Sequence, residues 1–367
     1  MKRFAAVLFF FAAFLYNGYA HADAAAAVVL EARTGRVLYA LNESQPLPMA
    51  STTKIMTALV ALENASLSDI VTTGDNAYGV PGTSIYLQKG EQLTLEQMLY
   101  GLMLASGNDA AVAIAEHVGG TVPGFCDMMN ARAQQIGCRN THFTTPHGLP
   151  AQQHYTTAYD LALIAREAMK NADFRRIVST QRAVIPWQGH DDDRVLNNKN
   201  RLLAAYPGAL GIKTGYTRAA GRCLAFAAER DGMTLIGTVL ACPDWFTQAE
   251  ALLDQTFERY EMYCALGENE TVAQLPVMEG VTDWVSVTLH QELSGPVPQG
   301  TIPSVRLTLP ESLHAGFDAQ ETIGVAELID GDTTIASALL YPAQGVSERT
   351  FLTGLEQAVR YWLILEQ

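Results

Sequence analysis

Strand-like sequence at two places far apart in the chain encloses a long helical region. The predicted strands are a hairpin at residues 27–41 and later segments at 210–217, 222–228 and 234–241. Apolar residues recur at helical spacing over 51–63, 94–104, 110–118, 123–136, 157–170 and 246–263. Because apolar strands must pair and be covered, this order predicts an α/β domain whose sheet joins distant segments, with a helical insertion and one covering helix.

The character of the sequence changes near Gly267. Residues 268–348 alternate between apolar and polar side chains and show no long helical pattern, so we expect a small all-β domain at 267–349. Residues 350–367 then carry apolar side chains at helical spacing, namely Leu352, Leu355, Val359, Trp362 and Leu363. An amphipathic helix of this kind could lie on a membrane surface or pack back onto the protein, and the sequence leaves both possibilities open.

The first residues have the organisation of a secretion signal. Lys2 and Arg3 precede an apolar run over 4–16, and Ala20-His21-Ala22 fits the small-residue cleavage rule. We therefore expect a signal peptide at 1–22, a mature chain from Asp23 and a first domain at 23–266. The mature protein is expected at the outer face of the cytoplasmic membrane, outside the cell or in the cell wall. An uncleaved membrane anchor is the alternative.

The net charge limits the classes of partner, and the cysteines limit the disulfides that the chain can form. The formal net charge is −14 and no basic patch is visible, which argues against nucleic acid as a partner. Five cysteines are an odd number for an exported chain. Cys126 and Cys138 are the only pair close in sequence, and two buried free thiols are favoured over a disulfide between them. No metal or cofactor is expected.

The stretch that carries chemistry begins at Ser51, where the first long helix is expected to start. Lys54 follows three residues later, so both side chains fall on one helical face. An amine held beside a serine hydroxyl can accept its proton if burial or neighbouring cations keep that amine neutral. Alone, this spacing is also typical of an ordinary helix start followed by a solvated lysine.

Two further triplets strengthen the interpretation. Ser106-Gly107-Asn108 falls in a loop between predicted helices, and Lys213-Thr214-Gly215 lies on a predicted strand. With Ser51-Thr52-Thr53-Lys54, they form the three-part set of penicillin-recognising serine enzymes. From about Ala27 to Tyr260 the chain resembles the D-alanyl-D-alanine carboxypeptidases, which are low-molecular-mass penicillin-binding proteins. The similarity includes Gly82-Thr83-Ser84, 144–149, His154-Tyr155-Thr156-Thr157 and 211–217.

The resemblance implies a penicillin-recognising serine transferase fold with an antiparallel sheet and a helical subdomain. It also implies attack by Ser51 on the carbonyl between two terminal D-alanines of a peptidoglycan stem pentapeptide, with Lys54 as the proton acceptor. β-Lactams would acylate the same serine. The remaining implied roles are proton return by Ser106 with Lys213, positioning by Asn108, carboxylate binding by Lys213 and Thr214, and an oxyanion hole at Ser51 and Tyr216 beside Gly215.

Some features depart from the family pattern or leave alternatives. The family often has an arginine near the start of the last helix of the domain, where this chain has Thr247-Gln248, so Lys199 or Arg201 is expected to compensate. His147 is interpreted as a structural turn residue. A class A β-lactamase is disfavoured because no Glu-x-x-Leu-Asn stretch lies between Asn108 and Lys213. A D,D-endopeptidase uses the same residues, and a non-catalytic wall-binding protein is a further alternative.

Overall fold

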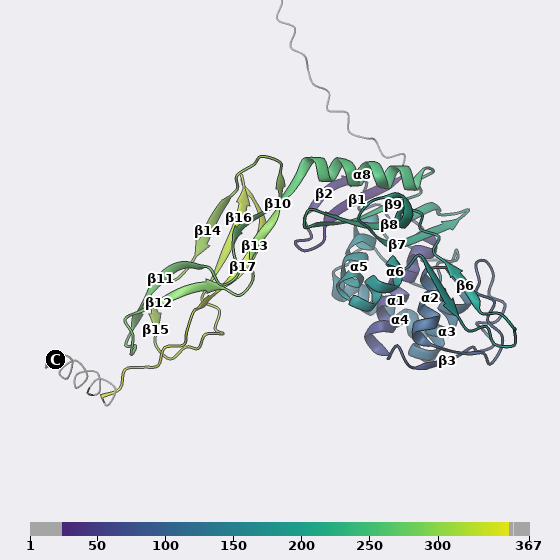
Figure 1. Ribbon diagram of the computed structural model, residues 1–367, viewed down its shortest axis with the longest axis horizontal. Coiled ribbons are helices and arrows are strands. Elements are labelled where there is room, and N and C mark those ends of the chain that lie inside the picture. The colour runs from purple at the N-terminus through teal and green to yellow at the C-terminus, as the bar shows by residue number, and fades with distance from the viewer. Residues whose placement is uncertain (1–23, 352–354, 356–367) are drawn as a thin grey trace, which may run out of the picture.

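The computed structural model describes residues 24–351 and 355. Figure 1 shows an α/β part that contains helices α1 to α8 and an elongated, β-rich part that follows α8. The helices of the first part are α1 (Lys54–Asn64), α2 (Leu95–Met103), α3 (Asn108–Gly119), α4 (Val122–Ile136), α5 (Ala158–Lys170), α6 (Ala172–Ser179), α7 (Leu202–Ala205) and α8 (Trp245–Arg259). No helix of the described residues has the length and apolar character needed to cross a bilayer.

One antiparallel sheet organises the α/β part. Its strands are β1 (Ala26–Glu31), β2 (Val37–Leu41), β7 (Ala209–Thr217), β8 (Gly221–Arg230) and β9 (Met233–Leu240). They lie in the order β2-β1-β9-β8-β7, so the N-terminal hairpin pairs with a strand about two hundred residues later. The predicted joining of distant segments is therefore confirmed.

Both faces of this sheet are covered, which explains why β1 is buried along its whole length. Alternate residues of each strand point to opposite faces. Val28 of β1 belongs to the larger apolar core beneath helices such as α1 and α5, whereas its neighbour Val29 belongs to the core beneath α8. The helical insertion and the covering helix that the sequence predicts are therefore both present.

The short elements beside the helices are not predicted by the sequence, apart from a short strand within 71–90. They are the two-stranded sheets β3 (Ile70–Thr72) with β4 (Gln92–Thr94) and β5 (Arg182–Ile185) with β6 (Arg194–Asn197), together with α6 and α7. The four strands and α7 span only three or four residues each, too few to give a clear sequence periodicity. Gly82 and Thr83 lie between β3 and β4, Lys199 follows β6 closely, and all three residues border the candidate site.

The β-rich part is built from β10 (Tyr260–Leu266), β11 (Thr271–Met278), β12 (Trp284–Leu289), β13 (Leu293–Pro298), β14 (Ser304–Thr308), β15 (Leu313–His314), β16 (Gly324–Asp330) and β17 (Thr333–Pro342). These strands enclose a third apolar core. The helix predicted over Phe246–Tyr263 is wrong at its end, because α8 stops at Arg259 and β10 begins at Tyr260. Since β10 pairs with β13, we propose a domain boundary between Arg259 and Tyr260 instead of at Gly267.

Arg36 joins the two parts. Its guanidinium donates a hydrogen bond to the carbonyl of Pro296 (2.7 Å) and lies 3.7 Å from the carboxylate of Asp330. The same group lies 6.0 Å from the ring centre of Tyr260. These contacts attach the turn between β1 and β2 to the β-rich part.

Candidate active site

Ser51 and Lys54 lie side by side at the start of the first long helix, as their spacing predicts. The first turn is a short 3₁₀ helix over Ala50–Thr53, and α1 begins at Lys54. The Nζ of Lys54 lies 3.0 Å from the Oγ of Ser51. Ala50, just before the serine, has a φ of 49°, a conformation that costs a non-glycine residue energy and that clusters at functional sites.

The amine of Lys54 has two further partners. It donates a hydrogen bond to Oδ1 of Asn108 (2.7 Å) and another to the carbonyl of His147 (2.9 Å). The Lys54 side chain is fully buried, although lysine is rarely buried without a specific reason. Three oxygens from three separate segments of the chain therefore surround this nitrogen.

The surroundings of Lys54 favour its neutral form. Burial lowers the pKa of Lys54 well below its usual value, and the nearby ammonium groups of Lys213 and Lys199 lower it further. The carboxylate of Asp109 acts in the opposite direction. Burial also lowers the pKa of Lys213 to about 7, with Lys199 as the second cause. Two lysines of the predicted site are thus shifted toward the physiological range.

Lys213, Thr214 and Gly215 lie on β7, and this strand runs directly beside the nucleophile. A Cβ atom on Gly215 would lie 2.9 Å from the backbone nitrogen of Ser51 and 3.0 Å from that of Thr52. Contacts this short are not observed between real side chains and backbone, so only glycine allows the strand to approach so closely. Tyr216 follows, and its side chain is exposed at the rim.

The third predicted motif lies between α2 and α3, and Ser106 is buried there with a φ of 63°. The resemblance pairs Ser106 with Lys213 for proton return, but no hydrogen bond joins them in the described part of the chain. Instead, Lys213 donates to the carbonyl of its neighbour Thr214 (3.0 Å). A fully buried amine must find an acceptor, and the adjacent carbonyl of its own strand supplies one.

These segments enclose a cleft of about 410 Å³. Ser51, Ser106, Asn108, Thr214, Gly215 and Tyr216 line it. So do Lys199 and Trp245, the first residue of α8. Of the two cations expected to replace the missing arginine, only Lys199 borders the cleft. Arg201 lies with its guanidinium 5.1 Å from the ring centre of Phe246.

His147 contributes through its backbone. Its carbonyl accepts the hydrogen bond from Lys54, and its ring nitrogen Nδ1 accepts one from the backbone nitrogen of Leu149 (3.2 Å). Burial, followed by the charge of Lys54, lowers the pKa of His147 to about 3, so the ring stays neutral. Sequence reasoning missed this carbonyl, because any residue type can supply one. The motif 144–149 was the available signal.

This arrangement defines a penicillin-recognising serine enzyme, and comparison with known proteins identifies the family. Residues 16–243 match the family model of the S11 peptidases, D-alanyl-D-alanine carboxypeptidase. The chain belongs to this family. It is a serine-type D-Ala-D-Ala carboxypeptidase that acts on peptidoglycan.

Similarity to individual relatives extends over both parts of the molecule. The chain is 32% identical over 351 residues to the D-alanyl-D-alanine carboxypeptidase DacF of Bacillus subtilis, covering 93% of this chain and 90% of the relative. Penicillin binding protein 5 from Haemophilus influenzae has a similar structure, with a TM-score of 0.78, 29% identity, and coverage of 89% of this chain and 98% of that one. The D-alanyl-D-alanine carboxypeptidase DacD from Francisella tularensis also has a similar structure. Its TM-score is 0.68 at 28% identity, with coverage of 90% of this chain and 95% of that one.

Proposed function

We propose that Ser51 is the acylated nucleophile and that Lys54 is the base that accepts its proton. The observation that carries this proposal is the 3.0 Å separation of the two groups around a fully buried amine. A neutral amine can donate to Asn108 and His147 and still offer its lone pair to the Ser51 hydroxyl. Its lowered pKa favours this protonation state.

Ser51 Oγ bonds to the carbonyl carbon between the two D-alanines while its proton moves to Lys54. The C–N bond then breaks, and the leaving D-alanine amine takes a proton. The proton that Lys54 accepted replaces the one given to the leaving amine. Water then attacks the carbonyl carbon of the ester, the bond to Ser51 Oγ breaks, one water proton passes through Lys54 to Ser51 Oγ, and the shortened peptide leaves with a new carboxyl group. We assign proton return to Ser106 and Lys213, which requires the Lys213 amine to leave the Thr214 carbonyl when substrate binds.

The backbone N–H groups of Ser51 and Tyr216 are proposed as the oxyanion hole. The close approach of Gly215 to the Ser51 nitrogen supports this proposal, because it holds β7 against the first turn of the nucleophile's helix. Such a donor contributes roughly 3 kcal/mol to stabilisation of the transition state.

Lys199, with Lys213 and Thr214, is proposed to bind the free carboxylate of the substrate. Lys199 borders the cleft, whereas Arg201 stacks on Phe246. Lys199→Ala should therefore raise KM for a D-Ala-D-Ala peptide about tenfold or more, and Arg201→Ala should leave it nearly unchanged. The reverse result would assign the carboxylate site to Arg201.

Mass spectrometry after brief exposure to penicillin tests the nucleophile. We expect one stable adduct on Ser51, and Ser51→Ala should show neither the adduct nor release of D-alanine from a pentapeptide. An adduct elsewhere, or release without Ser51, would overturn the assignment. The adduct should persist, so rapid turnover of a chromogenic cephalosporin would favour a β-lactamase. Release of D-alanine from cross-linked dimers would add an endopeptidase activity.

We also propose export through residues 1–22 and peripheral membrane contact through 352–367, all but one of which lie outside the described residues. Exposed apolar side chains where this segment begins support the second proposal: Phe351 is 85% exposed and Leu355 is 53% exposed. Trp284 and Met278 are also exposed on the nearby hairpin of β11 and β12. Deleting residues 352–367 should release the protein from membranes, and continued fractionation with membranes would contradict the proposal.

A further inference from the structure

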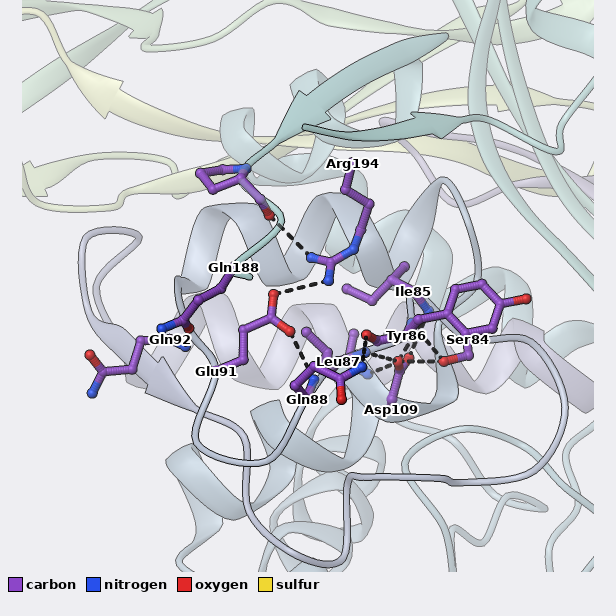
Figure 2. Close-up of polar contacts among 12 residues, drawn as sticks. Ser84, Ile85, Tyr86, Leu87, Gln88, Glu91, Gln92, Asp109, Gln188 and Arg194 are labelled. Carbon is purple, nitrogen blue, oxygen red and sulfur yellow. Dashed lines mark hydrogen bonds and ion pairs between the residues drawn. The ribbon is translucent and has the colours of Figure 1, made fainter. Parts of the chain in front are cut away.

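A buried carboxylate follows directly after Asn108 and holds the loop that borders the cleft. Asp109 is 1% exposed. Its carboxylate accepts hydrogen bonds from the hydroxyl of Ser84 (2.5 Å) and from the backbone nitrogens of Ile85 and Leu87 (3.1 Å each). Figure 2 shows these bonds converging on Asp109 from one strongly curved loop. Its charge raises the pKa of Lys54, but no step of the proposed mechanism passes through this carboxylate.

The same loop fixes the amide of Asn108. The Nδ2 of Asn108 donates to the carbonyl of Pro81 (2.6 Å), and its backbone nitrogen donates to the carbonyl of Thr83 (2.7 Å). With Nδ2 committed to Pro81, only Oδ1 remains to face Lys54. Gly82 lies between these carbonyls with a φ of +92°, and a Cβ atom there would lie 2.8 Å from the Asn108 amide. The path of this loop therefore determines which end of the amide meets the base.

We propose that Asp109 is a positioning residue, whose carboxylate holds loop 81–87 so that Pro81 orients the Asn108 amide toward Lys54. The inference rests on the proposed roles of Lys54 and Asn108. Without the carboxylate, the nitrogens of Ile85 and Leu87 lose their acceptor and the loop loses its curvature. The Asn108 amide can then rotate, and Lys54 loses the oxygen that places its lone pair toward Ser51.

The same loop provides a matched control at its far end. Glu91 is another buried carboxylate, which accepts from the Gln88 nitrogen (2.8 Å) and pairs with Arg194 (2.9 Å). Figure 2 shows this pair on the side of the loop away from Asp109. Neither Glu91 nor Arg194 contacts a residue that binds Lys54. Glu91→Gln therefore perturbs the folding of the loop without the link that Asp109 provides.

The test is a double-mutant cycle on the rate of acylation by penicillin, measured in the full chain at temperatures below the unfolding transition of each variant. Asp109→Ala and Asn108→Ala should each slow acylation roughly 100-fold. Because Asp109 acts through Asn108, the double variant should be close to the slower single variant instead of the product of both losses. Asp109→Asn, which retains one acceptor oxygen, should be intermediate. Glu91→Gln should lower the unfolding temperature but change acylation by less than about threefold.

Each outcome decides the matter. Multiplied losses in the double variant, or an equal loss in Glu91→Gln at a similar unfolding temperature, would reduce Asp109 to a general structural residue. Slow acylation in Asn108→Ala with a normal rate in Asp109→Ala would overturn this inference alone. Normal acylation in Lys54→Ala and Asn108→Ala would instead overturn the proposed function.

Discussion

Gly215 passes so close to the backbone nitrogen of Ser51 that a methyl group on it would collide with the start of the nucleophile's helix. The strand that carries the candidate carboxylate site and the turn that carries the nucleophile are therefore positioned against each other without an intervening side chain. The backbone therefore fixes the distance between the two halves of the cleft.

Gly215→Ala should separate β7 from Ser51 and displace one donor of the proposed oxyanion hole. We expect acylation by penicillin to slow roughly 100-fold, the usual effect of removing such a donor. Gly267→Ala is the matched control, because its Cβ atom would meet only the flexible end of Glu270 at 3.6 Å. A normal acylation rate in Gly215→Ala would contradict the prediction, because it would show that β7 can move away from Ser51 without slowing acylation.

Removing the charge of Lys199 should shift both the acidic and the basic limb of the pH profile of kcat/KM. The proposed base Lys54 must be neutral, so kcat/KM falls at acidic pH, whereas Lys213 must be protonated, so kcat/KM falls as pH rises through about 7. Burial is the main cause of the lowered pKa of both groups, and the charge of Lys199 lowers each pKa further. Lys199→Gln should therefore shift both limbs to higher pH, and Lys170→Gln, an exposed lysine remote from the cleft, should shift neither. A shift to lower pH would contradict the assignment.

The two buried lysines also predict how stability changes with pH. Their pKa values are lower in the folded protein than in the unfolded chain, so the unfolded state binds more protons between about pH 7 and pH 10. The free energy of unfolding contributed by these groups should rise with pH over that window. Lys213→Met should flatten the rise when unfolding by urea is followed at several pH values. An unchanged slope would indicate that Lys213 titrates normally.

Removing one partner of the ion pair between Glu91 and Arg194 should lower the free energy of unfolding. Arg194→Met leaves a fully buried carboxylate without its cation, and we expect a loss of about 3–5 kcal/mol in the free energy of unfolding. The double variant Glu91→Gln with Arg194→Met should recover most of that loss, because no charge is then buried alone. Urea unfolding measures both, and a loss below about 1 kcal/mol in the single variant would contradict the prediction.

Arg36→Ala should loosen the attachment between the two parts of the molecule. It removes the hydrogen bond to Pro296 and the ion pair with Asp330, which together contribute about 1–2 kcal/mol. Limited proteolysis near Tyr260 should become faster while acylation by penicillin stays normal. Arg306→Ala removes an exposed ion pair within the β-rich part and should leave the proteolysis pattern unchanged.

The site residues that could be predicted from sequence have reactive side chains and lie on elements with a clear apolar pattern. Ser51, Lys54 and the strand around Lys213 lie on elements with a clear apolar pattern, so their position could be predicted. The carbonyls of His147 and Pro81 could not, because a backbone acceptor leaves no trace in residue identity. Asp109 could not be found either, because its partners lie in a loop more than twenty residues earlier in the chain.

The same reasoning explains the error at the end of α8. The apolar residues Phe257 and Tyr260 continue the helical spacing, but the pairing of Tyr260–Leu266 with β13 involves residues some thirty positions later. Long-range strand pairing overrides a local helical preference, and no window of sequence around Tyr260 contains that information.

Helix α8 and strand β10 share no spacer: one ends at Arg259 and the other begins at the following residue (Figure 1). This connection is stiff, because β10 is paired with β13 and Arg36 bonds β13 to the turn between β1 and β2. The cleft is therefore held in a fixed orientation relative to the β-rich part, without a flexible linker between them. Under the proposed membrane contact through residues 352–367, the cleft would reach only a narrow range of distances from the membrane, and stem peptides outside that range would stay uncut.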